Sequence, residues 1–238
     1  NAVRNSLYGK GAGESITTGD ENSAFGVRAL DATTTGGGNT AIGLDALGSN
    51  TTANFNVAVG SDSMRANTTG TSNVAVGQGA LYSNTTASHN TAVGFQSLQG
   101  NTTGTNNTAV GRQSLYQNQT GAYNTALGFN AAYGTTGSSN TAVGNQSLQT
   151  NTSGGGNTAL GQSAMYSGTT GSNNVAVGDQ SLYANTTANH NVAVGKSAMQ
   201  NNTTGTENVG VGNYALSNNT TANYNTALGY STLGTNTT

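Results

Sequence analysis

The sequence predicts an all-β protein, a parallel β-roll or β-solenoid of about fourteen 17-residue repeats, and three observations predict it. An Asn opens the pattern Asn-(Thr/Val/Ser)-small-apolar-Gly fourteen times. The spacing is 17 residues except for one 16-residue step, and a short fixed period is typical of solenoids and fibres. Only 6% of the residues are charged, yet the register is strict, which argues against disorder. We expect residues 1–238 to form a single repeat array without a separate globular domain. The repeats begin at residues 5, 22, 39, 56, 73, 90, 107, 124, 140, 157, 174, 191, 208 and 225.

Positions one to five of each repeat, counted from the Asn, predict a short strand that ends at a bend. Position two alternates between Thr and Val, position three is usually Ala, position four is apolar and position five is Gly in all fourteen copies. We expect the Asn side chains to stack as an amide ladder. The Gly column predicts positive φ or a close approach of two chain segments. The columns include Asn56, Asn73, Asn90, Asn107, Val59, Val76, Gly60, Gly77, Gly94 and Gly111.

Positions six to eleven predict a second strand. Position eight is Ala or Ser in thirteen copies, and position nine is Leu or Met in twelve, as at Leu81 and Leu98. A single helical turn is the alternative, but the segment is too short for a stable helix. We expect positions four and nine to supply about two large apolar side chains per coil, which do not offset the cost of ordering 17 residues. The small residues at positions three, five and eight therefore predict close approach of another chain in an oligomer.

Positions twelve to fifteen, Asn-Thr-Thr-Gly or Asn-Thr-Thr-Ala, predict a turn. The single deletion falls here, within residues 134–137, as expected for an outer loop. The two Thr columns, which include Thr68, Thr69, Thr85 and Thr86, could present hydroxyl groups to ice or satisfy their own backbone. The many Asn-Thr-Thr strings also match the N-glycosylation pattern, but they follow from composition alone.

A column of Tyr residues at position ten is the second candidate surface. Its rings could stack on sugars, or they could pack on one another from coil to coil. The column consists of Tyr82, Tyr116, Tyr133, Tyr166 and Tyr183.

The remaining residues indicate no enzyme, cofactor or metal site. No paired carboxylates and no nucleophile with a base recur in the repeats, and His89 and His190 lie six repeats apart. The net charge of −2 predicts no attraction to nucleic acid, and no apolar run approaches the ~20 residues of a membrane span. Since Cys is absent, there are no disulfides or thiolate metal ligands. We expect the chain, which starts without Met, to be part of a longer or processed protein.

The strand segments carry a family resemblance. The strings Asn56-Val-Ala-Val-Gly60 and Asn73-Val-Ala-Val-Gly77, followed by pairs such as Ala80-Leu81, resemble the head repeat of trimeric autotransporter adhesins, the YadA-like family. Similar repeats occur in trimeric surface fibres of phages and bacteria. The resemblance implies a left-handed parallel β-roll with three chains around one axis. The family repeat is shorter than 17 residues, and the extra residues fall in the Asn-Thr-Thr-Gly turn.

The resemblance implies a structural or adhesive segment of an extracellular trimeric fibre, on a cell surface or a virion. Its expected partners are two further copies of the chain and, for an adhesive segment, a host-surface glycan or protein. One alternative is a monomeric β-solenoid that binds ice through its Thr columns. Another is a passive spacer, with adhesion carried elsewhere.

Overall fold

A computed structural model describes residues 4–237, and in this part of the chain it contains fourteen three-residue strands and no helix. One strand opens each repeat, directly after the Asn of position one. The predicted array also includes residues 1–3 and 238, which lie outside the described part. The strands are β1 (Ser6–Tyr8), β2 (Ser23–Phe25), β3 (Thr40–Ile42), β4 (Val57–Val59), β5 (Val74–Val76), β6 (Thr91–Val93), β7 (Thr108–Val110), β8 (Thr125–Leu127), β9 (Thr141–Val143), β10 (Thr158–Leu160), β11 (Val175–Val177), β12 (Val192–Val194), β13 (Val209–Val211) and β14 (Thr226–Leu228).

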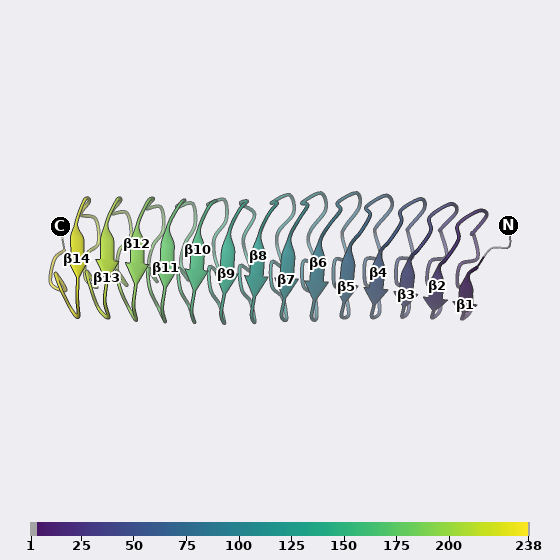
Figure 1. The fold of residues 1–238 in the computed structure, drawn as a ribbon, viewed down its shortest axis with the longest axis horizontal. Helices are drawn as coiled ribbons and strands as arrows, with labels where there is room; N and C mark the ends of the chain where they lie inside the picture. The colour runs from purple at the N-terminus through teal and green to yellow at the C-terminus, as the bar shows by residue number, and fades with distance from the viewer. Residues whose placement is uncertain (1–3, 238) are drawn as a thin grey trace. The chain divides into compact units, whose positions relative to one another are not determined.

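The chain divides into two compact units, Asn1–Ala122 with β1 to β7 and Tyr123–Thr238 with β8 to β14. Within each unit the strands pair in parallel with their sequence neighbours, and each residue pairs with its equivalent in the next repeat, as Val57 does with Val74. Each coil contains one strand and returns to the next strand through turns (Figure 1). The prediction of a parallel β-solenoid is therefore confirmed within each unit.

The middle residue of each strand points into the coil. Ala58 and Ala75 at position three are fully buried, whereas Val59 is half-buried and Val76 is 36% exposed. Successive strand residues point to opposite faces, so a buried position three turns positions two and four outward. The expectation that position four lies in the core is therefore wrong.

Positions six to eleven form turns, so the expectation of a second strand is wrong. Gln96 at position seven has a φ of 54° and Leu98 at position nine has a φ of 50°, and the equivalent residues of other coils have similar values. Strands require strongly negative φ, so two left-handed residues two positions apart cannot belong to one. Leu81 and Leu98 are fully buried, and position nine alone supplies the large apolar side chains of the interior.

The small residues serve the coil to which they belong. Positions three and eight are buried inside it, as Ala92 and Ser97 show. Gly94 at position five has a φ of 128°, and a Cβ atom there would lie 2.6 Å from the carbonyl oxygen of Gly111. Gly60, Gly77 and Gly111 have φ values of 131°, 133° and 129°. The expectation that these small residues face another chain is therefore wrong.

Two ladders of buried Asn side chains complete the interior. At position one, the Asn73 backbone N–H donates to Asn56 Oδ1 at 2.9 Å, and Asn73 Nδ2 donates to the Ala87 carbonyl at 2.9 Å. The same bonds link Asn90 to Asn73 and Asn107 to Asn90. At position twelve, Asn84 Nδ2 donates to Asn67 Oδ1 at 2.8 Å. Since a buried amide is costly unless it is hydrogen-bonded, these ladders allow polar groups to fill a narrow core.

The second ladder is interrupted in the second unit, where position twelve is Thr135 in one coil and Gly168 in another. Thr135 Oγ1 and Asn151 Oδ1 are buried without a hydrogen-bond partner. The deletion is absorbed in the coil of Thr135, where Asn124 Nδ2 still reaches the Gly137 carbonyl at 2.9 Å. The missing residue corresponds to position fourteen, which is exposed in the neighbouring coils, so the deletion leaves the first ladder intact.

Candidate functional site

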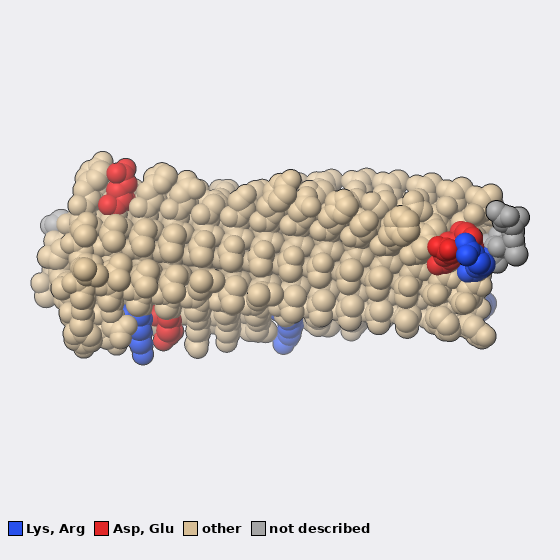
Figure 2. All heavy atoms as spheres, viewed as in Figure 1, with Lys and Arg blue, Asp and Glu red and all other residues tan. Residues whose placement is uncertain are grey.

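The outward side chains of positions two and four form the largest regular surface of each unit, which we call the sheet face. Position two is Ser, Thr or Val, position four is Tyr, Phe, Ile, Val or Leu, and neither position carries a charge in any copy. Parallel pairing in register places like residues over like, at about the 4.8 Å spacing of neighbouring strands. The result is a flat surface of β-branched and apolar side chains. Charged side chains are few and scattered in the view of Figure 2.

The sheet face is most exposed in the first coils. Tyr8 is 68% exposed, and Phe25 and Ile42 are each 41% exposed. The rings of Tyr8 and Phe25 stack at 5.2 Å with an interplanar angle of 9°. Beside them, Val27 and Leu44 at position six are 45% and 46% exposed. Contiguous exposed apolar surface of this kind marks an interaction site more often than an isolated apolar residue does.

The two predicted Thr columns have different roles. At position thirteen, Thr68 Oγ1 donates to the Thr85 carbonyl at 3.1 Å, and Thr85 Oγ1 donates to the Thr102 carbonyl at 3.2 Å. At position fourteen, Thr69 and Thr86 are exposed, and among residues 4–237 no position-fourteen hydroxyl has a hydrogen bond within the protein. One column therefore ties coils together, and the other faces solvent.

The five predicted Tyr residues are all half-buried. The rings of Tyr166 and Tyr183 stack at 5.2 Å and 6°, so they cover each other's faces. Tyr82 and Tyr116 lie two coils apart in the first unit, and Tyr133 belongs to the second unit. Positions seven and ten of adjacent coils are neighbours, as the 3.0 Å bond from Gln200 Nε2 to Gln180 Oε1 shows.

Charged residues gather on the turns of the first unit. Arg28 donates to both carboxylate oxygens of Asp45 at 2.6 Å, which lowers the pKa of Asp45, and Arg65 lies 3.3 Å from Asp62. Burial raises the pKa of Asp31, which lines a cavity of about 220 Å³ with Arg28, Asp45 and Arg65. Within the described residues, no three His, Cys, Asp or Glu side chains come close enough to hold a metal ion. The cluster is largely neutralised by its own ion pairs.

Comparison with known proteins does not place the chain in a family. No family model matches it, and no curated protein or solved structure is similar to it. Among residues 4–237, no helix is long and apolar enough to cross a membrane. The functional interpretation therefore depends on the surfaces described above.

Two features were missed at the level of sequence. The sheet face was assigned to the core, although Ala between two larger residues in each strand could have indicated that the larger ones point outward. Tyr214 and Tyr230, at positions seven and six, lie outside the position-ten column, and nothing in the repeat pattern distinguishes them.

Proposed function

We propose that this chain is a segment of an extracellular fibre in which three copies pack through their sheet faces and present the remaining surface for multivalent attachment. The observation that carries this proposal is the uncharged, apolar and regularly spaced sheet face.

Burial of the sheet face stabilises the assembly. Removing apolar surface from water contributes roughly 25 cal/mol per Å². The strand residues that carry this surface are already hydrogen-bonded to their neighbours, so packing a second sheet against them leaves no ladder group unpaired. The identical columns also suit contact with further copies of the same chain, because most homo-oligomers are closed and symmetric.

Three copies rather than two are supported by the resemblance of the strand segments to the head repeats of trimeric adhesins. Each copy contributes one sheet face, and three such faces around an axis cover one another. The thin interior of a single coil supports the same conclusion, since only position nine provides large buried apolar side chains.

A fibre of repeated coils acts through number rather than through one site. Equivalent side chains recur every 17 residues, and weak contacts that form together raise the overall affinity without any new contact. A segment that only spaces other domains is the alternative within this proposal. Binding to cell-surface glycans or proteins separates the two roles.

The mass of the assembly tests the proposal. Light scattering of the wild-type chain at micromolar concentration should give about three times the 23.6 kDa chain mass. Replacing Val76 and Val110 of the sheet face, which are 36% and 37% exposed, with Lys should give monomers. The matched control replaces Thr69 and Thr103, exposed at position fourteen with the same separation, with Lys and should leave the mass unchanged. A stable wild-type monomer would contradict the proposal.

Ice binding by a single chain is a second candidate, and the exposed position-fourteen hydroxyls favour it. Only one column of free hydroxyls is available, because the position-thirteen hydroxyls donate to backbone carbonyls. Thermal hysteresis that disappears when Thr69 and Thr86 are replaced by Tyr would establish this function instead.

A further inference from the structure

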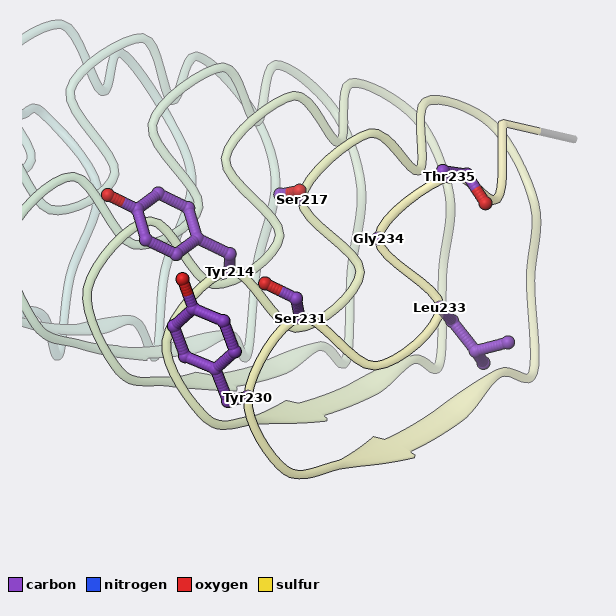
Figure 3. A pocket seen from close by; sticks show the side chains of 7 residues that line it. All are labelled: Tyr214, Ser217, Tyr230, Ser231, Leu233, Gly234 and Thr235. Carbon is purple, nitrogen blue, oxygen red and sulfur yellow. The ribbon is translucent and has the colours of Figure 1, made fainter.

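An open cleft lies beside the turns of the last coils of the second unit (Figure 3). Its volume is about 650 Å³, within the ~300–1,000 Å³ range of small-molecule sites. It is lined mainly by Tyr214, Ser217, Tyr230, Ser231 and Thr235. None of these residues belongs to the sheet face, so the cleft stays clear of the surface that we propose to be buried between copies.

The two tyrosines offer an aromatic surface to a ligand. Their ring centroids lie 6.1 Å apart and the ring planes meet at 82°. In an edge-on pair, the ring that contributes its edge keeps both faces clear of the other ring. Tyr230 is 75% exposed and Tyr214 is 37% exposed. The parallel pair of Tyr166 and Tyr183 differs in this respect, because each of those rings covers the other.

Five side-chain hydroxyl groups surround these rings, and within the described residues none of them forms a hydrogen bond to the protein. A hydroxyl group both donates and accepts hydrogen bonds, so the set can match a ligand that does the same. No charged residue lines the cleft. The ion pair of Lys196 and Asp179 in the same unit, with 3.9 Å between its atoms, is not part of the lining.

We infer that this cleft binds an uncharged saccharide. A pyranose ring has an apolar C–H face that suits an aromatic ring and a rim of hydroxyls that suits the five protein hydroxyls. Anionic glycans and nucleic acids are recognised mainly by Arg and Lys, which the lining lacks. A purely apolar ligand would leave the hydroxyls buried without partners, which is costly. The inference rests on the proposed attachment role and names the ligand class for it.

The inference is tested by measuring the binding of the full chain to maltotetraose, cellotetraose and chitotetraose, with sialylated and uronic-acid oligosaccharides beside them. At least one neutral tetrasaccharide should bind, and Tyr230→Ala should weaken its binding about tenfold, a loss typical of one ring contact. Tyr224→Ala is the matched control. Tyr224 is also 75% exposed but lies at position seventeen and outside the lining, so its loss should change affinity less than twofold.

Saturation transfer from tyrosine ring protons to the sugar in the wild-type protein gives a readout that does not depend on how the variants fold. The inference is overturned if no neutral saccharide binds at millimolar concentration, if the anionic oligosaccharides bind more tightly, or if Tyr224→Ala and Tyr230→Ala have equal effects. The mass of the same sample is measured separately. A trimer that ignores saccharides overturns this inference alone, and a monomer that binds them through Tyr230 overturns the fibre alone.

Discussion

Single residues in each coil adopt backbone conformations that most residues avoid. Gln96, Leu98 and Asn106, at positions seven, nine and seventeen, have φ values of 54°, 50° and 59°. The left-handed region costs a non-glycine residue roughly 1–2 kcal/mol. Leu98 offsets this cost by complete burial and by donating its N–H to the Ser114 carbonyl at 2.9 Å. Gly at position five differs, because a Cβ atom there would collide with the next coil.

Gly94→Ala should therefore destabilise the first unit by at least ~2 kcal/mol, since a strained backbone and a backbone clash combine. The clashing atom is the Gly111 carbonyl oxygen, 2.6 Å from the added Cβ. Gly79→Ala is the control, because Gly79 has a φ of 64° and its nearest neighbouring atom would lie 3.5 Å away. It should cost only ~1 kcal/mol. Thermal unfolding measures both, and equal effects would argue against the close approach of the glycines.

Asp45→Asn should lower the melting temperature at pH 7 and have less effect in acid. The hydrogen bonds from Arg28 hold the folded-state pKa of Asp45 below its ordinary value of 3.8, so its contribution is complete above that value and is lost as the pH falls through the folded pKa. Asn tolerates the left-handed φ of 54° at this position, so the change isolates the charge.

The measurement is the difference in melting temperature between wild type and Asp45→Asn from pH 7 to pH 2. Asp179→Asn, whose carboxylate lies 3.9 Å from Lys196 at the surface, serves as the comparison and should have the smaller effect at pH 7. A difference for Asp45→Asn that does not change with pH would show that the ion pair does not contribute.

The strand, the ladder and the turn together explain most of each coil. The ladder works because Asn offers an acceptor to the next coil and a donor to its own turn, as Asn73 does through Oδ1 to Asn90 and through Nδ2 to Ala87. Where position twelve changes to Gly168, Asn151 Oδ1 loses its partner. The energetic unit is therefore the column rather than the single side chain.

Gly168→Asn should restore the position-twelve column and stabilise the second unit. The new Nδ2 would reach Asn151 Oδ1 as Asn84 Nδ2 reaches Asn67 Oδ1. Gly168→Ala is the control, because it restricts the unfolded chain equally without adding an amide. We expect the Asn variant to exceed the Ala variant by ~1 kcal/mol, the value of one satisfied buried group. Urea unfolding measures the difference, and an Ala variant at least as stable as the Asn variant would contradict the ladder argument.

Much of each coil could be predicted from the sequence, and the rest follows from physics that the sequence does not display. The strand and the turn were predictable, because β-branched residues before Gly and Asn-Thr-Thr strings have strong local preferences. The left-handed residues at Gln96 and Leu98 were not, because neither side chain prefers that region and only contacts with the adjacent coils select it. The cleft of Tyr214 and Tyr230 was not predictable either, because it depends on two residues outside any column.

At the scale of the whole molecule, composition separates the two kinds of surface. Ten of the fourteen formal charges lie between Arg4 and Arg65, and none lies at positions two or four. Both units share the same uncharged sheet face. Association through this face should therefore depend on apolar burial rather than on ion pairs.

The proposed assembly should accordingly keep its mass in about 1 M NaCl, where interactions between exposed charges are screened within ~3 Å. Sedimentation at low and high salt measures this directly. An assembly held by the Arg and Asp residues of the first unit would instead dissociate as the salt concentration rises, and that result would move the interface from the sheet face to the turns.

Burial of the position-twelve amides has a practical consequence for producing this protein. Asn67, Asn84 and Asn101 each begin an Asn-Thr-Thr string and are completely enclosed once their coil has closed. Oligosaccharyltransferase in a eukaryotic secretory pathway modifies nascent chains, and a bulky sugar attached there could not enter the space that the folded coil allows. Yeast or mammalian secretion should therefore yield misfolded material, and hosts that lack this enzyme should yield the folded chain.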